Sequence, residues 1–235
     1  MTKHLTPADL AAIEAAVRQA EAKTCGEIYC VVAEQSGHYG ETPVAWAAGA
    51  ALLAPALLLL AGIHVTAPDL FGAGWTAEQV GAAAQAAVRQ ALVGAVLLQA
   101  VLFTLVAIVV ALRPVRLALT PRSVRRHEVR RRAREIFQSK GLHLTRARTG
   151  VLIFVSLAER MAELIADEGI AEHVEPKVWD RAMAALAEGL KRGEPGAGFA
   201  AAVGLCGDVL AERFPADPDD NPDELSDAVV VLPRA

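Results

Sequence analysis

Hydrophobic residues are spread very unevenly along this chain. Two long stretches, Val44–Ile63 and Gln90–Leu112, contain no charged residue. As a helix, each would span roughly 30 Å, the thickness of a bilayer core. Both are apolar on every side, whereas most helices of a soluble protein of this size keep a polar stripe. The pattern therefore favours a hairpin of two transmembrane helices over a pair of core helices.

The segments before and after this hairpin have the patterns of a mixed α/β domain. Thr6-Pro7-Ala8-Asp9 is a typical helix start, and Glu27–Ala33 has the composition of a strand. Residues 151–155 form an unbroken apolar run entered through Gly150, which predicts a strand buried on both faces. Apolar stripes at helical spacing predict two further helices, one after Pro176 and one around 199–210.

The segment after the apolar run is ambiguous. Leu157, Met161 and Leu164 recur at helical spacing, while Met161, Glu163 and Ile165 alternate as in a strand. Periodicity alone slightly favours a helix.

A resemblance to a known family favours the strand. The apolar strand led by Gly150, the turn with Glu159-Arg160, the segment ending in 167–170 and the helix carrying Trp179 resemble the TPM domain. The family is named after thylakoid acid-phosphatase-like proteins, and this chain resembles its membrane-inserted bacterial type. The resemblance implies an α/β fold, an α/β/α sandwich with a small mixed sheet, in which Glu159–Asp167 is the second arm of a β-hairpin.

This resemblance covers residues 120–227 well and 6–34 more loosely. Because the first helix and strand are too small to fold alone, we expect them to join the C-terminal part in one sheet. The transmembrane hairpin then interrupts the sandwich. The predicted boundaries are 1–43 for the first part of the domain, 44–112 for the hairpin, 113–214 for the rest of the domain and 215–235 for an acidic, proline-rich tail.

Composition supports segments buried in lipid. Hydrophobic residues make up 54% of the chain but aromatic residues only 5%, and the mean hydropathy is positive. The three cysteines, Cys25, Cys30 and Cys206, form no CxxC pair and cannot all pair with one another. We expect them to be small buried residues in a reducing compartment.

Arginines gather directly after the second apolar stretch. By the positive-inside rule this cluster stays in the cytoplasm, which predicts two spans in a bacterial inner (plasma) membrane, with both termini cytoplasmic. The short loop with Trp75 would then face outward. The arginines of the cluster are Arg113, Arg116, Arg122, Arg125, Arg126, Arg130, Arg131, Arg132 and Arg134.

Three interpretations of the arginine cluster compete. A nucleic-acid site requires a recognisable module or stacking aromatic residues, and only Phe137 is nearby, so we expect no nucleic-acid partner. The cluster also fits a topology signal that binds anionic lipid headgroups, and it fits the solvated face of a helix. On the lipid interpretation, the residues that contact anions are Arg113, Arg116, Arg122, Arg125 and Arg126.

No catalytic signature is present, such as GxSxG, HExxH or a phosphate-binding glycine loop. The resemblance implies metal-associated acids and weak phosphatase activity in some relatives, with Ca²⁺ or Mg²⁺ as the candidate cofactor. Where the family often has Asp-Asn-Gly before its apolar strand, this chain has Arg148-Thr149-Gly150 and so lacks that acid. Candidate metal ligands that remain at the sheet ends are Glu27, Glu159, Asp167 and Glu168.

Arg160 is a candidate anion contact beside these acids, although Glu159-Arg160 also fits a simple polar turn. The function we expect is a membrane protein whose cytoplasmic domain is a binding module or assists membrane-protein assembly or maintenance. Its partners would be membrane lipid and a membrane protein, with oligomers allowed. The alternative is a membrane-anchored, metal-dependent phosphatase. A transporter is disfavoured because neither span contains an ionisable group.

Overall fold

The computed structural model describes residues 5–62, 77–146, 148–217 and 225–234. The chain divides into two compact units. The first unit combines residues 1–38 with 122–235, and the second consists of residues 39–121. Each unit is described by itself below.

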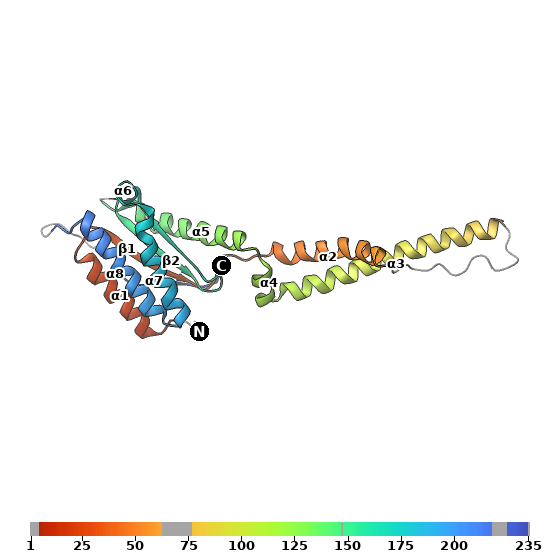
Figure 1. The fold of residues 1–235 in the computed structure, drawn as a ribbon, viewed down its shortest axis with the longest axis horizontal. Helices are drawn as coiled ribbons and strands as arrows, with labels where there is room; N and C mark the ends of the chain where they lie inside the picture. The colour runs from red at the N-terminus through yellow and green to blue at the C-terminus, as the bar shows by residue number, and fades with distance from the viewer. Residues whose placement is uncertain (1–4, 63–76, 147, 218–224, 235) are drawn as a thin grey trace. The chain divides into compact units, whose positions relative to one another are not determined.

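A four-stranded mixed sheet forms the centre of the first unit (Figure 1). The strands are β1 (Glu27–Ala33), β2 (Gly150–Ser156), β3 (Met161–Ala166) and β4 (Val230–Leu232), in the order β3-β2-β1-β4. β1 is parallel to both neighbours, β2 and β4, while β2 and β3 form an antiparallel hairpin. The resemblance therefore predicted the segment after residue 160 correctly, and the helix favoured by periodicity is wrong.

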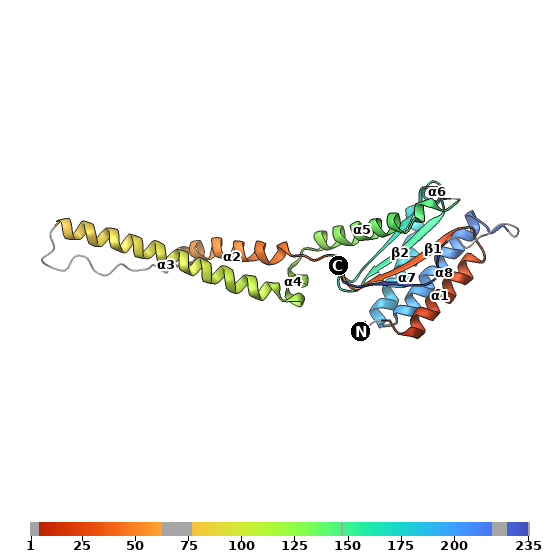
Figure 2. The same ribbon diagram turned by 180° about the vertical axis from the view of Figure 1, so that it is seen from behind.

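Helices cover both faces of this sheet, which gives the predicted α/β/α sandwich (Figure 2). One face carries α1 (Pro7–Glu21), α7 (Trp179–Arg192) and α8 (Pro195–Arg213), and the other carries α5 (Arg122–Ser139). The short helix α6 (Glu168–Ala171) follows β3. The remaining helical segments of this unit are the 3₁₀ turns Leu142–Leu144 and Pro176–Val178.

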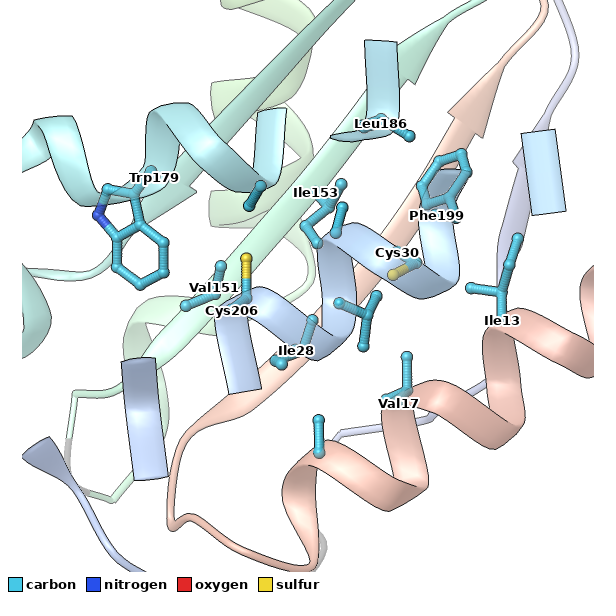
Figure 3. Packing of buried hydrophobic residues seen from close by; sticks show 14 of the residues in the cluster. Ile13, Val17, Ile28, Cys30, Val151, Ile153, Trp179, Leu186, Phe199 and Cys206 are labelled. Atoms are coloured by element: carbon cyan, nitrogen blue, oxygen red, sulfur yellow. The ribbon is translucent and has the colours of Figure 1, made fainter. Parts of the chain in front are cut away.

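The two central strands are buried over their whole length, because alternate side chains enter opposite cores. Ile28, Cys30 and Val32 face α1 and α8, together with Val151 and Ile153 of β2 (Figure 3). The intervening side chains of both strands pack with α5. They are Tyr29, Val31, Ala33, Leu152 and Phe154, against Val129, Ala133, Ile136 and Phe137.

All three cysteines are free thiols, and two of them belong to the core between the sheet and α8. Cys30 and Cys206 are buried there (Figure 3). Burial raises the pKa of the Cys206 thiol to about 12 and also raises the pKa of Cys30. Neither thiol is therefore a nucleophile at neutral pH, and both act as small apolar residues.

The second unit contains the helices α2 (Glu41–Leu60), α3 (Ala77–Ala111) and α4 (Arg113–Leu119). α2 packs along α3, and both helices are long and apolar enough to cross a membrane. Most of their large apolar side chains point away from this contact. Examples that are more than half exposed are Leu52, Leu53, Leu57, Leu92, Val96, Leu97, Leu105 and Ile108. The predicted outward-facing loop with Trp75 lies outside the described residues.

Two glycines of α8, Gly196 and Gly207, allow its close contact with α1. A Cβ atom at Gly207 would lie 2.5 Å from the Cβ atom of Ala20, well inside the contact limit. A Cβ atom at Gly204, three residues earlier on α8, would have no other atom within 4 Å. Of Gly204 and Gly207, only Gly207 closely approaches α1.

We expect Gly207→Ala to destabilise the protein by about 1–3 kcal/mol, because a methyl group forces α1 and α8 apart. Gly204→Ala is the matched control in the same helix. It should leave stability unchanged or raise it by up to about 1 kcal/mol, since alanine favours the helix. Denaturation of the detergent-purified protein measures both effects, and equal stabilities of the two variants would contradict the packing described here.

Candidate functional site

The four candidate acids lie at two opposite ends of the sheet. Glu27 begins β1 opposite Gly150, and the backbone N–H of Asp167 donates to the carbonyl of Gly150 at 2.9 Å. Glu159 lies instead in the turn that follows β2. Strands of seven residues place these ends roughly 20 Å apart. Glu159 therefore cannot share a metal ion with Asp167.

Glu159 belongs to a buried hydrogen-bond network. Its side chain is only 2% exposed. One carboxylate oxygen accepts the backbone N–H of Ser36 at 3.1 Å, and the other accepts the hydroxyl of Ser156. The Ser36 hydroxyl donates to Ser156 at 2.7 Å. This network connects the segment after β1 to the β2–β3 turn. Because both carboxylate oxygens of Glu159 already accept hydrogen bonds, its role is structural.

Arg160, the candidate anion contact, is exposed and has no ion pair within the described ranges. Its φ of 53° is left-handed, as often occurs in tight turns. Its backbone N–H donates to the carbonyl of Leu157 at 3.3 Å, which closes the turn. The position agrees with a polar turn, and anion binding by Arg160 stays a prediction.

Asp167 and Glu168 lie beside Arg148. The Nε atom of Arg148 lies 3.0 Å from Oδ2 of Asp167, and Nη2 lies 2.8 Å from Oε2 of Glu168. Asp167 is 4% exposed, and its Oδ1 accepts the backbone N–H of Glu168 at 2.8 Å, which caps α6. Gly150 is needed nearby, because a Cβ atom there would lie 2.4 Å from the carbonyl oxygen of Leu142.

Glu27 lies in a second acidic group at the same end of the sheet, formed with Glu21 and Asp227. Oε2 of Glu27 accepts the backbone N–H of Leu225 at 3.2 Å. Glu21 ends α1, and its Oε1 accepts the backbone N–H of Ile28 at 2.7 Å. Burial, together with the charges of Glu27 and Asp227, raises the pKa of Glu21 to about 9. Glu21 is thus protonated at neutral pH and hydrogen-bonds to Asp227.

These acids do not fit a divalent metal ion. Within the described ranges, no group of three or more His, Cys, Asp or Glu side chains could hold a metal ion. Asp167 has both carboxylate oxygens occupied, and Arg148 already supplies the positive charge. Ca²⁺ and Mg²⁺ both bind carboxylate oxygens, and an ion shared by Asp167 and Glu168 would have to displace the guanidinium of Arg148 from both acids.

The comparisons with known proteins agree with this architecture. The model of the TPM domain family matches residues 114–209. This chain contains a TPM domain. The matched range includes β2, β3 and α5–α7, but α1, β1 and β4 lie outside it, although they complete the sheet.

A solved structure has a similar fold to this TPM-domain chain. It is the NMR structure of BA42 protein from the psychrophilic bacterium Bizionia argentinensis, with 18% identity and a TM-score of 0.57. The similarity covers 98% of this chain and 97% of the other. A search among curated proteins gives no significant match. These comparisons establish the fold of the TPM domain.

The sequence did not reveal two important residues of this acidic end. Arg148 was noted for the acid it replaces, but its pairing with Asp167 depends on the register of the β2–β3 hairpin. Glu21 has the appearance of an ordinary last-turn acid, and its burial follows from α1 lying beside the start of β1. An acid placed shortly before a mostly apolar strand is a weak signal that could have indicated it.

The raised pKa of Glu21 predicts a stability that depends on pH. The folded protein holds this proton up to about pH 9, whereas the unfolded chain releases it near pH 4.5. The contribution of Glu21 to stability is therefore largest below pH 4.5 and is lost as the pH rises toward 9. We expect Glu21→Gln, which keeps an acceptor for Ile28, to be more stable than the wild type by at least about 1 kcal/mol at pH 8.

Thermal denaturation of both proteins between pH 5 and 9 measures this difference, which should grow with pH. Glu14→Gln is the control on the same helix, because Glu14 forms an exposed pair with Arg18. Its effect should stay within about 0.5 kcal/mol at every pH. A constant difference between wild type and Glu21→Gln across the pH range would contradict a protonated Glu21.

Proposed function

We propose that α2 and α3 cross a membrane and that the TPM domain is a binding module held at its cytoplasmic surface, where it serves the assembly or maintenance of membrane proteins. The observation that carries this proposal is the outward apolar surface of α2 and α3. Side chains such as Leu53, Leu60 and Leu97 are more than half exposed, and their exposure to water would be costly. A bilayer removes that cost.

The two ends of the helical hairpin lie together, as two spans require. The hydroxyls of Thr42 and Thr120 are 3.0 Å apart. The indole N–H of Trp46 donates to the carbonyl of Leu119 at 3.3 Å. Tryptophan is enriched at membrane interfaces, where its ring meets lipid and its N–H meets polar groups. This end of the hairpin has the features of an interface.

Ion pairing divides eight arginines of the cluster into two groups, while Arg134, later in α5, forms no ion pair within the described ranges and belongs to neither. The first group follows α3 directly in sequence, and within the described ranges its members form no ion pair. They are Arg113, Arg116, Arg122, Arg125 and Arg126.

The second group is neutralised by acids of the same domain. Arg130 pairs with Glu163 at 3.5 Å, and Arg131 pairs with Glu128 at 2.6 Å and with Glu135. Arg132 lies 3.4 Å from Glu135. A merely solvated helix face gives no reason for this division. Anionic headgroups would supply the missing partners for the first group, which supports the lipid interpretation.

Membrane insertion is tested by alkaline carbonate extraction of cells that express the full chain. We expect the protein to stay in the membrane pellet and to require detergent for release, because two apolar spans hold it in the bilayer. Recovery in the soluble fraction without detergent would contradict the insertion of α2 and α3.

Lipid binding is tested on α5 itself. We expect replacement of Arg122, Arg125 and Arg126 by Gln to weaken the affinity for phosphatidylglycerol in mixed micelles by about tenfold or more, since each arginine near an anionic surface contributes about 1 kcal/mol. Replacement of the neutralised residues 130–132 by Gln is the matched control and should change this affinity little. Equal losses in both variants would contradict a specific headgroup site.

Phosphatase and cross-linking assays distinguish the binding module from the alternative, a metal-dependent phosphatase. Hydrolysis of an aryl phosphate by the purified protein with Ca²⁺ or Mg²⁺, abolished in Asp167→Ala, would favour the enzyme. Stoichiometric cross-linking to a membrane protein without turnover would favour the binding module.

A further inference from the structure

Arg148 has a backbone conformation that most side chains avoid. Its φ is 56°, in the left-handed region, and its backbone N–H donates to the carbonyl of Thr145 at 3.0 Å. A residue other than glycine, asparagine or aspartate is uncommon in this region. From this position the side chain of Arg148 forms ion pairs with two carboxylates at once.

The carboxylate of Asp167 is buried where it meets this guanidinium. A buried carboxylate requires a cation or hydrogen-bond donors to offset its loss of hydration. Arg148 donates a charged hydrogen bond to one oxygen at 3.0 Å, and the backbone N–H of Glu168 donates to the other at 2.8 Å. The charge of Asp167 is therefore compensated within the chain.

The same guanidinium reaches the exposed carboxylate of Glu168 with its other arm. The planar guanidinium can donate to two neighbouring carboxylates at once, whereas the ammonium group of lysine is a single point of charge. A metal ion that bound both acids would have to displace Arg148 from Asp167 and Glu168. Within the described ranges, no third acid is arranged to complete its coordination.

We propose that the guanidinium of Arg148 takes the place of a metal ion between Asp167 and Glu168, at this end of the TPM domain. The chain thereby stabilises the β3–α6 junction without a divalent cation. The family resemblance implies an acid-lined metal site here, and this chain replaces the metal's charge with its own side chain. This inference is independent of the proposed membrane function.

The test compares two arginines that share a left-handed turn conformation. Arg148→Gln removes the cation from the acids, and Arg160→Gln is the matched control, since Arg160 has φ 53° and no ion pair within the described ranges. Full-length protein in detergent is melted with EDTA, with Ca²⁺ and with Mg²⁺. We expect the wild-type melting temperature to be the same in all three conditions.

Arg148→Gln should lower the melting temperature in EDTA by about 2–6 °C, while Arg160→Gln lowers it by less than about 1 °C. A fall in Arg148→Gln no larger than in Arg160→Gln would overturn the proposal. A wild-type melting temperature raised by Ca²⁺ or Mg²⁺, with the rise lost in Asp167→Asn, would also overturn it, because the acids would then bind a metal ion despite Arg148.

A second measurement covers the case in which Arg148→Gln does not fold. Calorimetric titration of the wild-type protein with Ca²⁺ and with Mg²⁺ should give no saturable heat. Saturable binding that disappears in Asp167→Asn would show that the end of the sheet holds a metal ion, against the proposal.

Discussion

The pairing of β1 with strands from a distant part of the chain is the constraint on which the structure depends. β1 is buried on both faces, paired with β2 over its whole length and paired with β4 at Val31–Ala33. A strand in this position cannot be removed or exposed without opening both cores of the sandwich. Because β1 and β2 are parallel, the chain between them must return from the end of β1 to the start of β2, and α5 packs on the sheet within that segment. The helical hairpin in the same segment begins and ends close together, since the hydroxyls of Thr42 and Thr120 are 3.0 Å apart.

The buried acids of the TPM domain have their partners within the domain itself. Acids that lie inside the sheet ends are compensated by the chain itself: Asp167 by Arg148, Glu159 by serine hydroxyl and backbone groups, and Glu21 by keeping its proton. Arginines at the start of α5 are the opposite case, since they have no internal partner within the described ranges. These arginines belong to the stretch of sequence that follows the apolar hairpin.

The sequence predicted those features that depend on local pattern. Residues 151–155 are an unbroken run of apolar, mostly β-branched and aromatic side chains, and they form the buried strand β2. The strand β3 was harder to predict, because every residue of Met161–Ala166 is only partly buried and an edge strand shows no clean alternation. The resemblance to the TPM family was needed there. The pairing of Arg148 with Asp167 joins residues 19 positions apart through hairpin register, which no local pattern contains.

The central position of β1 also has a consequence for biosynthesis. A ribosome makes β1 first, then both apolar helices, and only afterwards the strands that flank β1 on either side. Both edges of β1 are therefore open while the hairpin emerges, and an open apolar strand is prone to aggregate. The sheet closes last, when Val230–Leu232 has been made and returns to the outer edge of β1. Residues 27–33 thus emerge long before their partner strands and stay unpaired on the β4 side until Val230–Leu232 has been made.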